Sequence, residues 1–182
     1  GIIRINVGMF PEIAVDWAAV FAVLAVINVL YGAMVTLRQT DLKRLIAFSS
    51  ISHMGYVLLG VSSIGLGEGI SPVGITGAAM QMFTHGTITG LLFVMVGLIY
   101  DKAHTRHIPD LGGLASKMPF IAIALCVAGF GSLGLPSTSG FVSEVMVFMG
   151  AFPVYSVMTL LAVLGILITA GYILWTLQRT LF

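Results

Sequence analysis

The sequence predicts an all-α membrane protein, a polytopic bundle of about five transmembrane helices of which one is broken. Hydrophobic residues make up 58% of its 182 residues and charged residues only 8%, and the mean hydropathy is +1.08, values far outside those of a soluble domain. Apolar runs of about 20 residues, the length that crosses a bilayer, recur about five times. The runs are continuous rather than alternating, which favours helices over a β-barrel.

The charged residues lie mainly between these runs. We treat the chain as one transmembrane domain fragment, 1–182, with spans expected near 15–37, 42–62, 73–100, 119–150 and 154–178. It begins without Met or a signal peptide and ends directly after an apolar run. We therefore expect a piece of a longer polytopic protein.

The basic residues predict the orientation. Five spans place alternate loops on opposite sides, and most basic residues then share one side: Arg38, Lys43, Arg44, Lys102, Arg106, Lys117 and Arg179, against Arg4 alone. By the positive-inside rule the loops at 38–44 and 101–118 face the cytoplasm. The N-terminus and the loop that contains Glu68 are expected outside.

The fourth span, 119–150, is too long for one straight helix, since about 32 residues rise roughly 48 Å. Its middle reads GSLGLPSTSG. Pro136 removes a backbone donor and clashes with the preceding turn, and Gly134 and Gly140 relax the backbone on both sides. The hydroxyls of Ser137, Thr138 and Ser139 can satisfy the freed groups. We predict a broken helix near 134–140. A proline kink without function is the simple alternative to a break that lines a hydrated site.

Glu144 is the acidic residue that lies well inside a predicted span. A carboxylate at membrane depth costs several kcal/mol unless it is paired, hydrated or protonated, and such residues usually mark a proton or ion pathway. The alternative is a glutamate near the outer interface that is hydrogen-bonded by Ser143.

Two histidines also fall near the middle of spans. Helical spacing places His85 on one face with Gln81 and Thr89, and His53 on one face with Ser49. Neutral imidazole can both donate and accept a proton near physiological pH, so these histidines and the acid make a plausible proton relay. A hydrogen bond between helices is the alternative role for either histidine alone.

The predicted relay and its supporting residues are Glu144, His85 and His53, with Gln81, Thr89, Ser49, Pro136 and Ser139. A metal site is disfavoured because the candidate ligands fall on three spans without tight spacing. Gly86 and Gly90, on the adjoining face, are expected to let another helix pack closely.

Other classes of function find no support in the residues. The basic residues form no runs, so no nucleic-acid partner is expected. The single cysteine, Cys126, can hold neither an iron–sulfur cluster nor a cysteine-based metal site. No glycine-rich dinucleotide motif follows a strand. We therefore expect no cofactor, metal or redox centre in this chain.

Three stretches resemble the antiporter-like proton-pumping subunits of respiratory complex I: RQTDLKRLIAFSSISHMGYVLLG, GAAMQMFTHGTITGLLFVMVGLIYDKAHTRHIPDLGGL and LGLPSTSGFVSEVMVF. The part DLKRLIAFSSISHMG is shared with sister subunits and with multisubunit cation/proton antiporters. HTRHIPDLGGL and the glutamate after the break are more specific. They resemble subunit M, which is also called subunit 4 and which corresponds to the D subunit of the photosynthetic relative.

The resemblance implies a 14-helix antiporter-like fold with inverted repeats, of which this chain would supply the ninth to thirteenth helices. It implies that Glu144 ends the channel on the broken twelfth helix, with His53 on the tenth and His85 on the eleventh. The family's buried lysines would precede this chain. The implied function is proton translocation within an NADH:quinone oxidoreductase, a translocase whose electron transfer occurs in other subunits.

The same resemblance implies the surroundings of the chain. Its partners would be the neighbouring antiporter-like subunits of the membrane arm and the lipid bilayer, and NADH, FMN, iron–sulfur clusters and quinone would be bound by partner subunits. A bacterial plasma membrane is favoured over a thylakoid or mitochondrial inner membrane. Two other functions stay open: a subunit of a multisubunit sodium/proton antiporter or of a membrane-bound hydrogenase, and a purely structural membrane scaffold.

Overall fold

The structure is a computed structural model that describes residues 2–65 and 69–182. Most of the described chain is helical, which confirms the predicted all-α class. The helices are η1 (Ile3–Val7), α1 (Pro11–Leu37), α2 (Leu42–Ser62), α3 (Pro72–Ala103), η2 (Ile108–Asp110), α4 (Leu114–Lys117), α5 (Pro119–Leu133), α6 (Ser139–Ala151) and α7 (Ser156–Leu181). A short antiparallel pair that the sequence did not predict, β1 (Ile64–Gly65) and β2 (Gly69–Ile70), lies between α2 and α3. Glu68 lies outside the described residues.

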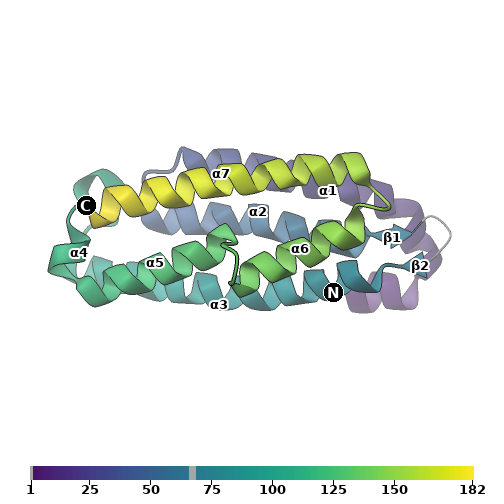
Figure 1. The fold of residues 1–182 in the computed structure, drawn as a ribbon, viewed down its shortest axis with the longest axis horizontal. Coiled ribbons are helices and arrows are strands. Elements are labelled where there is room, and N and C mark those ends of the chain that lie inside the picture. Colours follow the sequence, from purple (N-terminus) through teal and green to yellow (C-terminus); the bar gives the residue numbers. More distant parts are fainter. Residues whose placement is uncertain (1, 66–68) are drawn as a thin grey trace.

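The long helices run along one axis of an elongated bundle (Figure 1). Among the described residues, α1, α2, α3 and α7 are each long and apolar enough to cross a membrane. In place of a further straight span, the shorter apolar helices α5 and α6 follow one another along the bundle (Figure 1). The broken helix therefore occurs in the part of the sequence where proline and glycine interrupt the apolar run.

Polar side chains fix two of the helix starts. The Asp41 carboxylate accepts a hydrogen bond from the Arg44 backbone N–H at 3.0 Å, before α2. The Ser71 hydroxyl accepts one from the Gly74 N–H at 3.2 Å, before α3. Each bond satisfies one of the four backbone donors that the start of a helix leaves unpaired.

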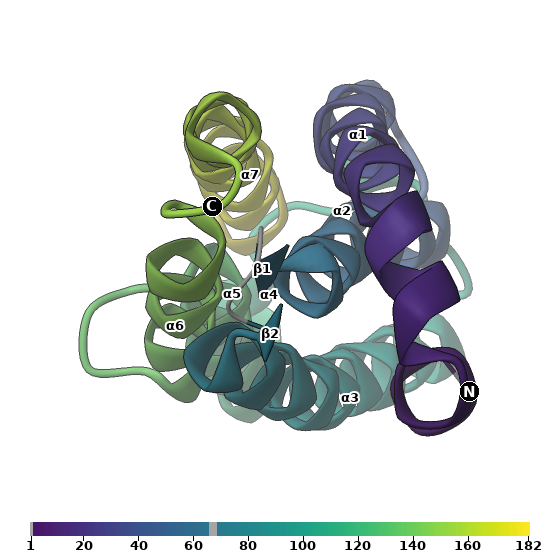
Figure 2. The ribbon, with the colours of Figure 1, turned by 90° about the vertical axis from the view of Figure 1, so that its right-hand side faces the viewer.

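Helix α2 lies in the middle of the bundle, with α1, α3, α5, α6 and α7 around it (Figure 2). Two glycines allow α1 and α2 to approach closely. A Cβ atom on Gly32 would lie 2.7 Å from the Ser52 backbone nitrogen, and one on Gly55 would lie 2.8 Å from the Ala25 carbonyl oxygen. The Ser52 hydroxyl donates to the Val29 carbonyl at 3.0 Å across the same contact. Ser49, Ser52 and His53 of α2 are therefore buried between the helices.

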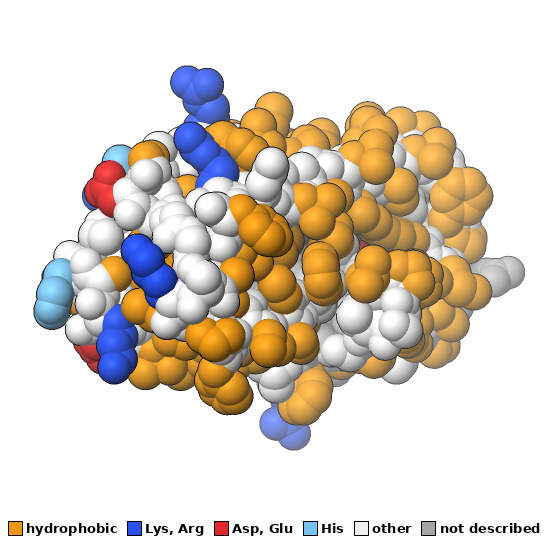
Figure 3. Space-filling model, turned by 60° about the vertical axis from the view of Figure 1, so that its left-hand side comes forward, with side chains coloured by type: hydrophobic (Ala, Val, Ile, Leu, Met, Phe, Trp, Pro, Cys, Tyr) orange, Lys and Arg blue, Asp and Glu red, His pale blue; other side chains and the backbone are white. Residues whose placement is uncertain are grey.

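The outer surface of the bundle is apolar, as expected for a protein that faces lipid or further membrane helices. Phe83, Leu167 and Ile123 are each more than 60% exposed. Basic side chains gather toward one end, where the loops between α1 and α2 and between α3 and α5 lie (Figures 1 and 3). Most basic side chains thus lie at one end of the bundle, while several polar side chains, including His53, Gln81 and Glu144, are buried inside it.

An ion pair joins two loops at this charged end. Arg106 Nε lies 2.9 Å from Asp41 Oδ2, and the Ile108 N–H donates to the Thr40 carbonyl at 2.7 Å. Partial burial raises the pKa of Asp41, but hydrogen bonds from the Arg44 N–H and from Arg106 outweigh this effect and hold the pKa below its ordinary value of 3.8. The ionised carboxylate therefore stabilises the folded loop.

We expect Asp41→Asn to loosen the 104–110 segment. Asparagine keeps the helix cap, so the change isolates the ion pair, which at this half-exposed position contributes at most about 1 kcal/mol. Amide exchange of Ile108 should then accelerate by up to about fivefold. In the unsubstituted protein the contribution is complete above pH 3.8 and disappears as the pH falls through the lower folded value. Asp101→Asn is the control, and equal exchange in both variants would contradict the prediction.

Candidate functional site

The helix break has its own backbone conformation. Gly134 ends α5 with φ 71°, and Ser137 has φ 83°, both in the left-handed region that favours glycine. Pro136 lies in the exposed turn between these residues. The Thr138 hydroxyl caps α6 by accepting from the Phe141 N–H at 3.4 Å. The glycine therefore ends α5, and Pro136 lies beyond that end rather than inside a kinked helix.

The structure corrects the role expected of Ser139. It is the first residue of α6 and its side chain is exposed, so Thr138, one position earlier, provides the cap. Serine and threonine cap helices through the residue just before the first turn, and the sequence offered three neighbouring hydroxyls without showing which would take that place.

Glu144 lies one turn into α6 with its carboxylate against the break. It is only 4% exposed, and a Cβ atom on Gly134 would lie 2.5 Å from Glu144 Oε2. The carboxylate oxygen Oε1 lies 3.8 Å from His53 Nδ1 of α2. The break and the acid are therefore one local structure, since the missing side chain at Gly134 makes room for the carboxylate.

His53 is the central residue of the cluster and is 2% exposed. Its Nδ1 lies 3.4 Å from Gln81 Nε2, and its Nε2 lies 3.2 Å from Ser132 Oγ. The rings of His53 and His85 are 4.9 Å apart between centroids. The three predicted relay residues thus come together from α2, α3 and α6, although they are far apart in the sequence.

His85 extends the cluster on α3. Its Nε2 lies 3.0 Å from Ser50 Oγ of α2, and its side chain is the most exposed of the three at 9%. Thr89 shares its buried face, but the Thr89 hydroxyl donates to the His85 backbone carbonyl at 2.6 Å. Thr89 therefore satisfies its own helix and does not contact the imidazole, contrary to the supporting role expected for it.

Gln81 connects the histidine to the far side of the site. Its Oε1 accepts a hydrogen bond from the Ser143 hydroxyl, which lies 3.4 Å from Thr84 Oγ1. The Ser143 hydroxyl has one proton and also lies 2.8 Å from the Gly140 carbonyl oxygen. When Ser143 donates to Gln81 Oε1, the amide Nε2 donates to His53 Nδ1, and the imidazole then carries its proton on Nε2, facing Ser132. The donor of the Ser143 hydroxyl bond and the tautomer of His53 are therefore linked through the Gln81 amide.

Four residues of the site were not predicted from the sequence as members of the relay or as its support: Ser50, Thr84, Ser132 and Ser143. Small hydroxyl residues are common in membrane helices, so periodicity alone does not separate these from the rest. Ser49, which was expected to support His53, instead donates to the Ile46 carbonyl at 2.7 Å. The adjacent Ser50 contacts His85.

A small cavity of about 10 Å³ lies among these side chains, which is room for about one water molecule. Its wall is formed by His53, Gln81, Thr84, His85, Ile88, Gly131, Ser132, Gly140 and Glu144. The separation of 3.8 Å between the carboxylate and the imidazole exceeds a direct hydrogen bond. One bridging water, or a small rotation of Glu144, would complete the connection.

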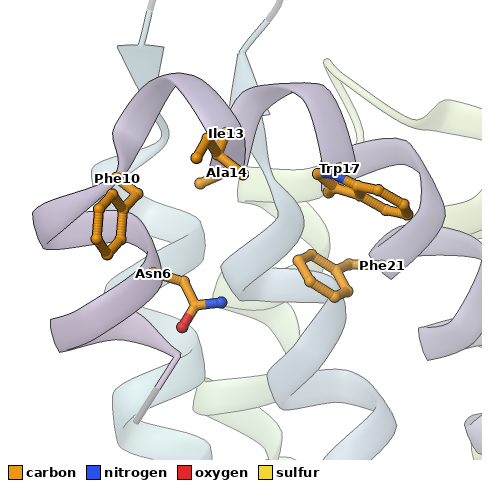
Figure 4. A pocket seen from close by; sticks show the side chains of 6 residues that line it. All are labelled: Asn6, Phe10, Ile13, Ala14, Trp17 and Phe21. Atoms are coloured by element: carbon orange, nitrogen blue, oxygen red, sulfur yellow. The ribbon is translucent and has the colours of Figure 1, made fainter.

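Other parts of the described chain offer less chemistry. A pocket beside the N-terminal segment is lined by Asn6, Phe10, Ile13, Ala14, Trp17 and Phe21 and has no ionisable side chain (Figure 4). Within residues 2–65 and 69–182, no three His, Cys, Asp or Glu side chains lie close enough to hold a metal ion.

The close helix packing expected at Gly86 and Gly90 does not occur among the described helices. A Cβ atom on either glycine would have nothing within 4 Å. Helix α3 instead presents Gly77 to α6, where a Cβ atom would lie 2.6 Å from the Val147 nitrogen. Helix α3 therefore packs against α6 through the face that carries both Gly77 and Gln81. Gly77 allows the close approach, and Gln81 hydrogen-bonds to Ser143 of α6.

The fold and the site define a polytopic membrane protein with a buried acid and two histidines beside a broken helix. Residues 1–169 match the transmembrane family described as NADH:quinone oxidoreductase/Mrp antiporter, and the chain belongs to this family.

The chain is similar to several curated proteins over its full length. It is 42% identical to the F(420)H(2) dehydrogenase subunit M of Methanosarcina mazei and 43% identical to the NAD(P)H-quinone oxidoreductase chain 4 1 of Synechococcus elongatus, covering all of this chain in both cases. It is 40% identical to the NADH-quinone oxidoreductase subunit M of Rickettsia felis over 96% of its residues. The chain spans 34 to 36% of the length of these relatives.

Two solved structures share the fold. A chain of respiratory complex I from Thermus thermophilus with bound NADH superposes with a TM-score of 0.93 at 31% identity, over all of this chain and 38% of that one. A chain of the Mrp complex from Dietzia sp. gives a TM-score of 0.83 at 25% identity, over 92% of this chain and 30% of that one.

Proposed function

We propose that this chain is the part of a membrane-arm subunit that transfers protons across the membrane while other subunits of an NADH:quinone oxidoreductase carry electrons. The observation that carries the proposal is the buried cluster of Glu144, His53 and His85 at the helix break. Ionisable groups are retained at this depth, despite their cost, chiefly where protons or ions move. The family membership and the subunit names of the relatives support the same function.

The relatives also suggest which part of the reaction this chain does not perform. Their names specify three different electron donors, F420H2, NADH and NAD(P)H, at nearly equal identities of 40 to 43%. A segment that bound the donor would be expected to differ among them in its polar contacts. The donor, FMN, the iron–sulfur clusters and the quinone are therefore assigned to partner subunits, and this chain takes part in a translocase without a redox centre of its own.

A carboxyl group as deeply buried as that of Glu144 is favoured in its neutral form, so the proposed route starts with a proton on Glu144. Glu144 holds a proton on its carboxyl group and passes it to His53 Nδ1, and His53 releases the proton from Nε2 toward Ser132. This exchange leaves the imidazole in the other neutral tautomer, with the proton on Nδ1, and Gln81 favours return to the starting one. His85, whose ring lies beside that of His53 and whose Nε2 contacts Ser50, is the next carrier on the same path. Release of the proton leaves Glu144 as a carboxylate, and the cluster returns to its starting charge when Glu144 takes up the next proton.

The sidedness of the chain belongs to the proposal. The loops at 38–44 and 101–118 lie at one end of the bundle (Figure 1), and seven of the eight basic residues belong to that side by the order of the spans. We assign this end to the cytoplasmic side of a bacterial plasma membrane. The proposed partners are the neighbouring antiporter-like subunits of the membrane arm and the surrounding lipid.

A sodium/proton antiporter subunit is the second candidate, favoured by the family description and by the likeness to the Mrp complex. The two functions differ in their dependence on sodium. Proton translocation that continues unchanged without sodium, and that requires electron transfer, supports the first. Sodium-dependent proton exchange without electron transfer supports the second.

His85→Ala in the full-length subunit separates proton transfer from a structural scaffold. We expect proton translocation per assembled complex to fall about 100-fold, the smaller end of the effect of a positioned acid–base group, because the imidazole is lost. Proton uptake and electron transfer are measured together in proteoliposomes. A scaffold role predicts fewer assembled complexes, each with undiminished translocation. Thr36→Val, which removes a buried hydroxyl bonded only within α1, is the control.

A further inference from the structure

Helix α6 carries Glu144, but the break at residues 134–138 separates this helix from α5. A helix of 13 residues that does not continue its predecessor takes its rotation from side-chain contacts with its neighbours. The carboxylate itself fixes little, because Glu144 Oε1 is 3.8 Å from His53 Nδ1, which is longer than a hydrogen bond. The separation of the acid and the histidine therefore depends on other residues of α6.

Two contacts about one turn beyond Glu144 hold α6 in place. Val147 is fully buried against α3, where Gly77 lets the two backbones approach. Phe148, four residues after Glu144 and so on the same side of the helix, meets the ring of Tyr56 of α2. The two rings are edge-on, with centroids 5.6 Å apart and an interplanar angle of 87°, an arrangement that aromatic pairs prefer. This second contact joins α6 to the helix that carries His53.

Tyr56 is itself closely held. It has no exposed surface, and its ring lies 6.1 Å from that of His53, three residues earlier on α2. Its phenol extends to α7, where a Cβ atom on Gly165 would lie 2.8 Å from the Tyr56 oxygen. The missing side chain at Gly165 thus makes room for the phenol. In an interior packed this closely a tyrosine has little room to change rotamer, so it is a fixed surface for Phe148.

The Tyr56 hydroxyl is not part of the relay. It donates to the Ala162 carbonyl of α7 at 3.4 Å, well beyond the usual O–H···O distance of about 2.7–2.8 Å, so this bond is weak. The two ring nitrogens of His53 are contacted by Gln81 and Ser132 instead. The ring of Tyr56, and not its hydroxyl, therefore links this residue to the site.

We infer that Tyr56 is a positioning residue for proton transfer between Glu144 and His53. Its ring, between the imidazole and Phe148, fixes the rotation of α6 and with it the reach of the carboxyl group toward Nδ1. The inference rests on the proposed proton function and adds a residue that acts on the transfer without holding the proton. Removing the ring leaves the acid and the histidine present, but their separation is no longer fixed.

The test uses the full-length subunit in its assembled complex. Tyr56→Leu and Phe148→Leu should each lower the number of protons moved per electron about tenfold, since a displacement of about 1 Å at a reacting group can cost about 100-fold. Both changes remove the same ring contact, so the double variant should also lose about tenfold rather than the product of about 100-fold. Tyr56→Phe keeps the ring and should restore native translocation. Phe148→Leu tests the contact independently if Tyr56→Leu assembles poorly.

An infrared difference spectrum separates positioning from stability. The carboxyl stretching band of Glu144, identified by its absence in Glu144→Gln, should shift in both leucine variants because the surroundings of the acid change. Leu59→Ala is the matched control, since Leu59 is a fully buried α2 residue of the same apolar cluster. It should lower the thermal unfolding temperature but leave the band, and translocation per assembled complex, native.

Native translocation and an unshifted band in both leucine variants would overturn the inference. So would losses that multiply in the double variant, or an equal loss in Tyr56→Phe. Each of these results leaves the proposed function in place when Glu144→Gln is defective. Native translocation in Glu144→Gln would contradict the proposed function instead, whatever the Tyr56 variants show.

Discussion

Replacing Glu144 by glutamine should abolish most proton translocation by the full-length subunit, while the complex still assembles and its other subunits still transfer electrons. Glutamine has nearly the same shape and can still fill the space beside Gly134, but its amide does not release or take up a proton. Positioned acid–base groups contribute about 10²- to 10⁴-fold to a proton-transfer step. We therefore expect at least about a 100-fold loss, measured as protons moved per electron transferred in proteoliposomes.

Glu12→Gln is the matched control for this change, since Glu12 lies in the exposed first turn of α1 and should have no effect. Glu144→Asp should recover part of the activity, because it keeps an acid on a shorter side chain. Native stoichiometry in the glutamine variant would rule out Glu144 as a carrier of the proton. It would also remove the main support for the proposed function.

Gly134→Ala should damage both the break and the acid. Alanine at φ 71° costs about 1–2 kcal/mol, and its methyl group would lie 2.5 Å from Glu144 Oε2, closer than any contact can be. Either the carboxylate moves or the turn opens. Because a displacement of about 1 Å at a reacting group can cost about 100-fold, translocation should fall about 10- to 100-fold, with a lower thermal unfolding temperature of the purified complex.

Gly112→Ala is suited as the control for this variant, because it adds a methyl group where nothing lies within 4 Å and where the backbone is not left-handed. Full activity in Gly134→Ala would show that the carboxylate is not held against the break. In that event the acid and the helix interruption would have to be treated as independent features.

Much of the fold followed from the sequence because lipid restricts the possible structures. Every backbone group in a bilayer must be paired within the chain, so long apolar runs indicate helices and little else. The same argument led to the interruption in 119–150, where length and the GSLGLPSTSG stretch disagree with one straight helix. It did not show which glycine would end the first half-helix or which of the three hydroxyls would cap the second. In the structure Gly134 ends α5 and Thr138 caps α6.

The candidate site was predictable in its ionisable members and much less so in its partners. Glu144, His53 and His85 stand out because charge is rare at membrane depth. Serine and threonine do not, since both are frequent in membrane helices. Whether a hydroxyl bonds its own helix, as in Thr89, or a neighbouring side chain, as in Ser132, depends on which helix packs against it.

The sequence alone determined the membrane class, the helices, the broken span and the three ionisable residues, since all of these depend on composition and spacing along one chain. The tertiary structure decided which groups meet: Glu144 and His53 at a separation of 3.8 Å, Gln81 and His53 Nδ1, and His85 and Ser50. These depend on the rotation of each helix about its own axis. That rotation is set by close contacts such as Gly77 against Val147, which no local pattern in the sequence specifies.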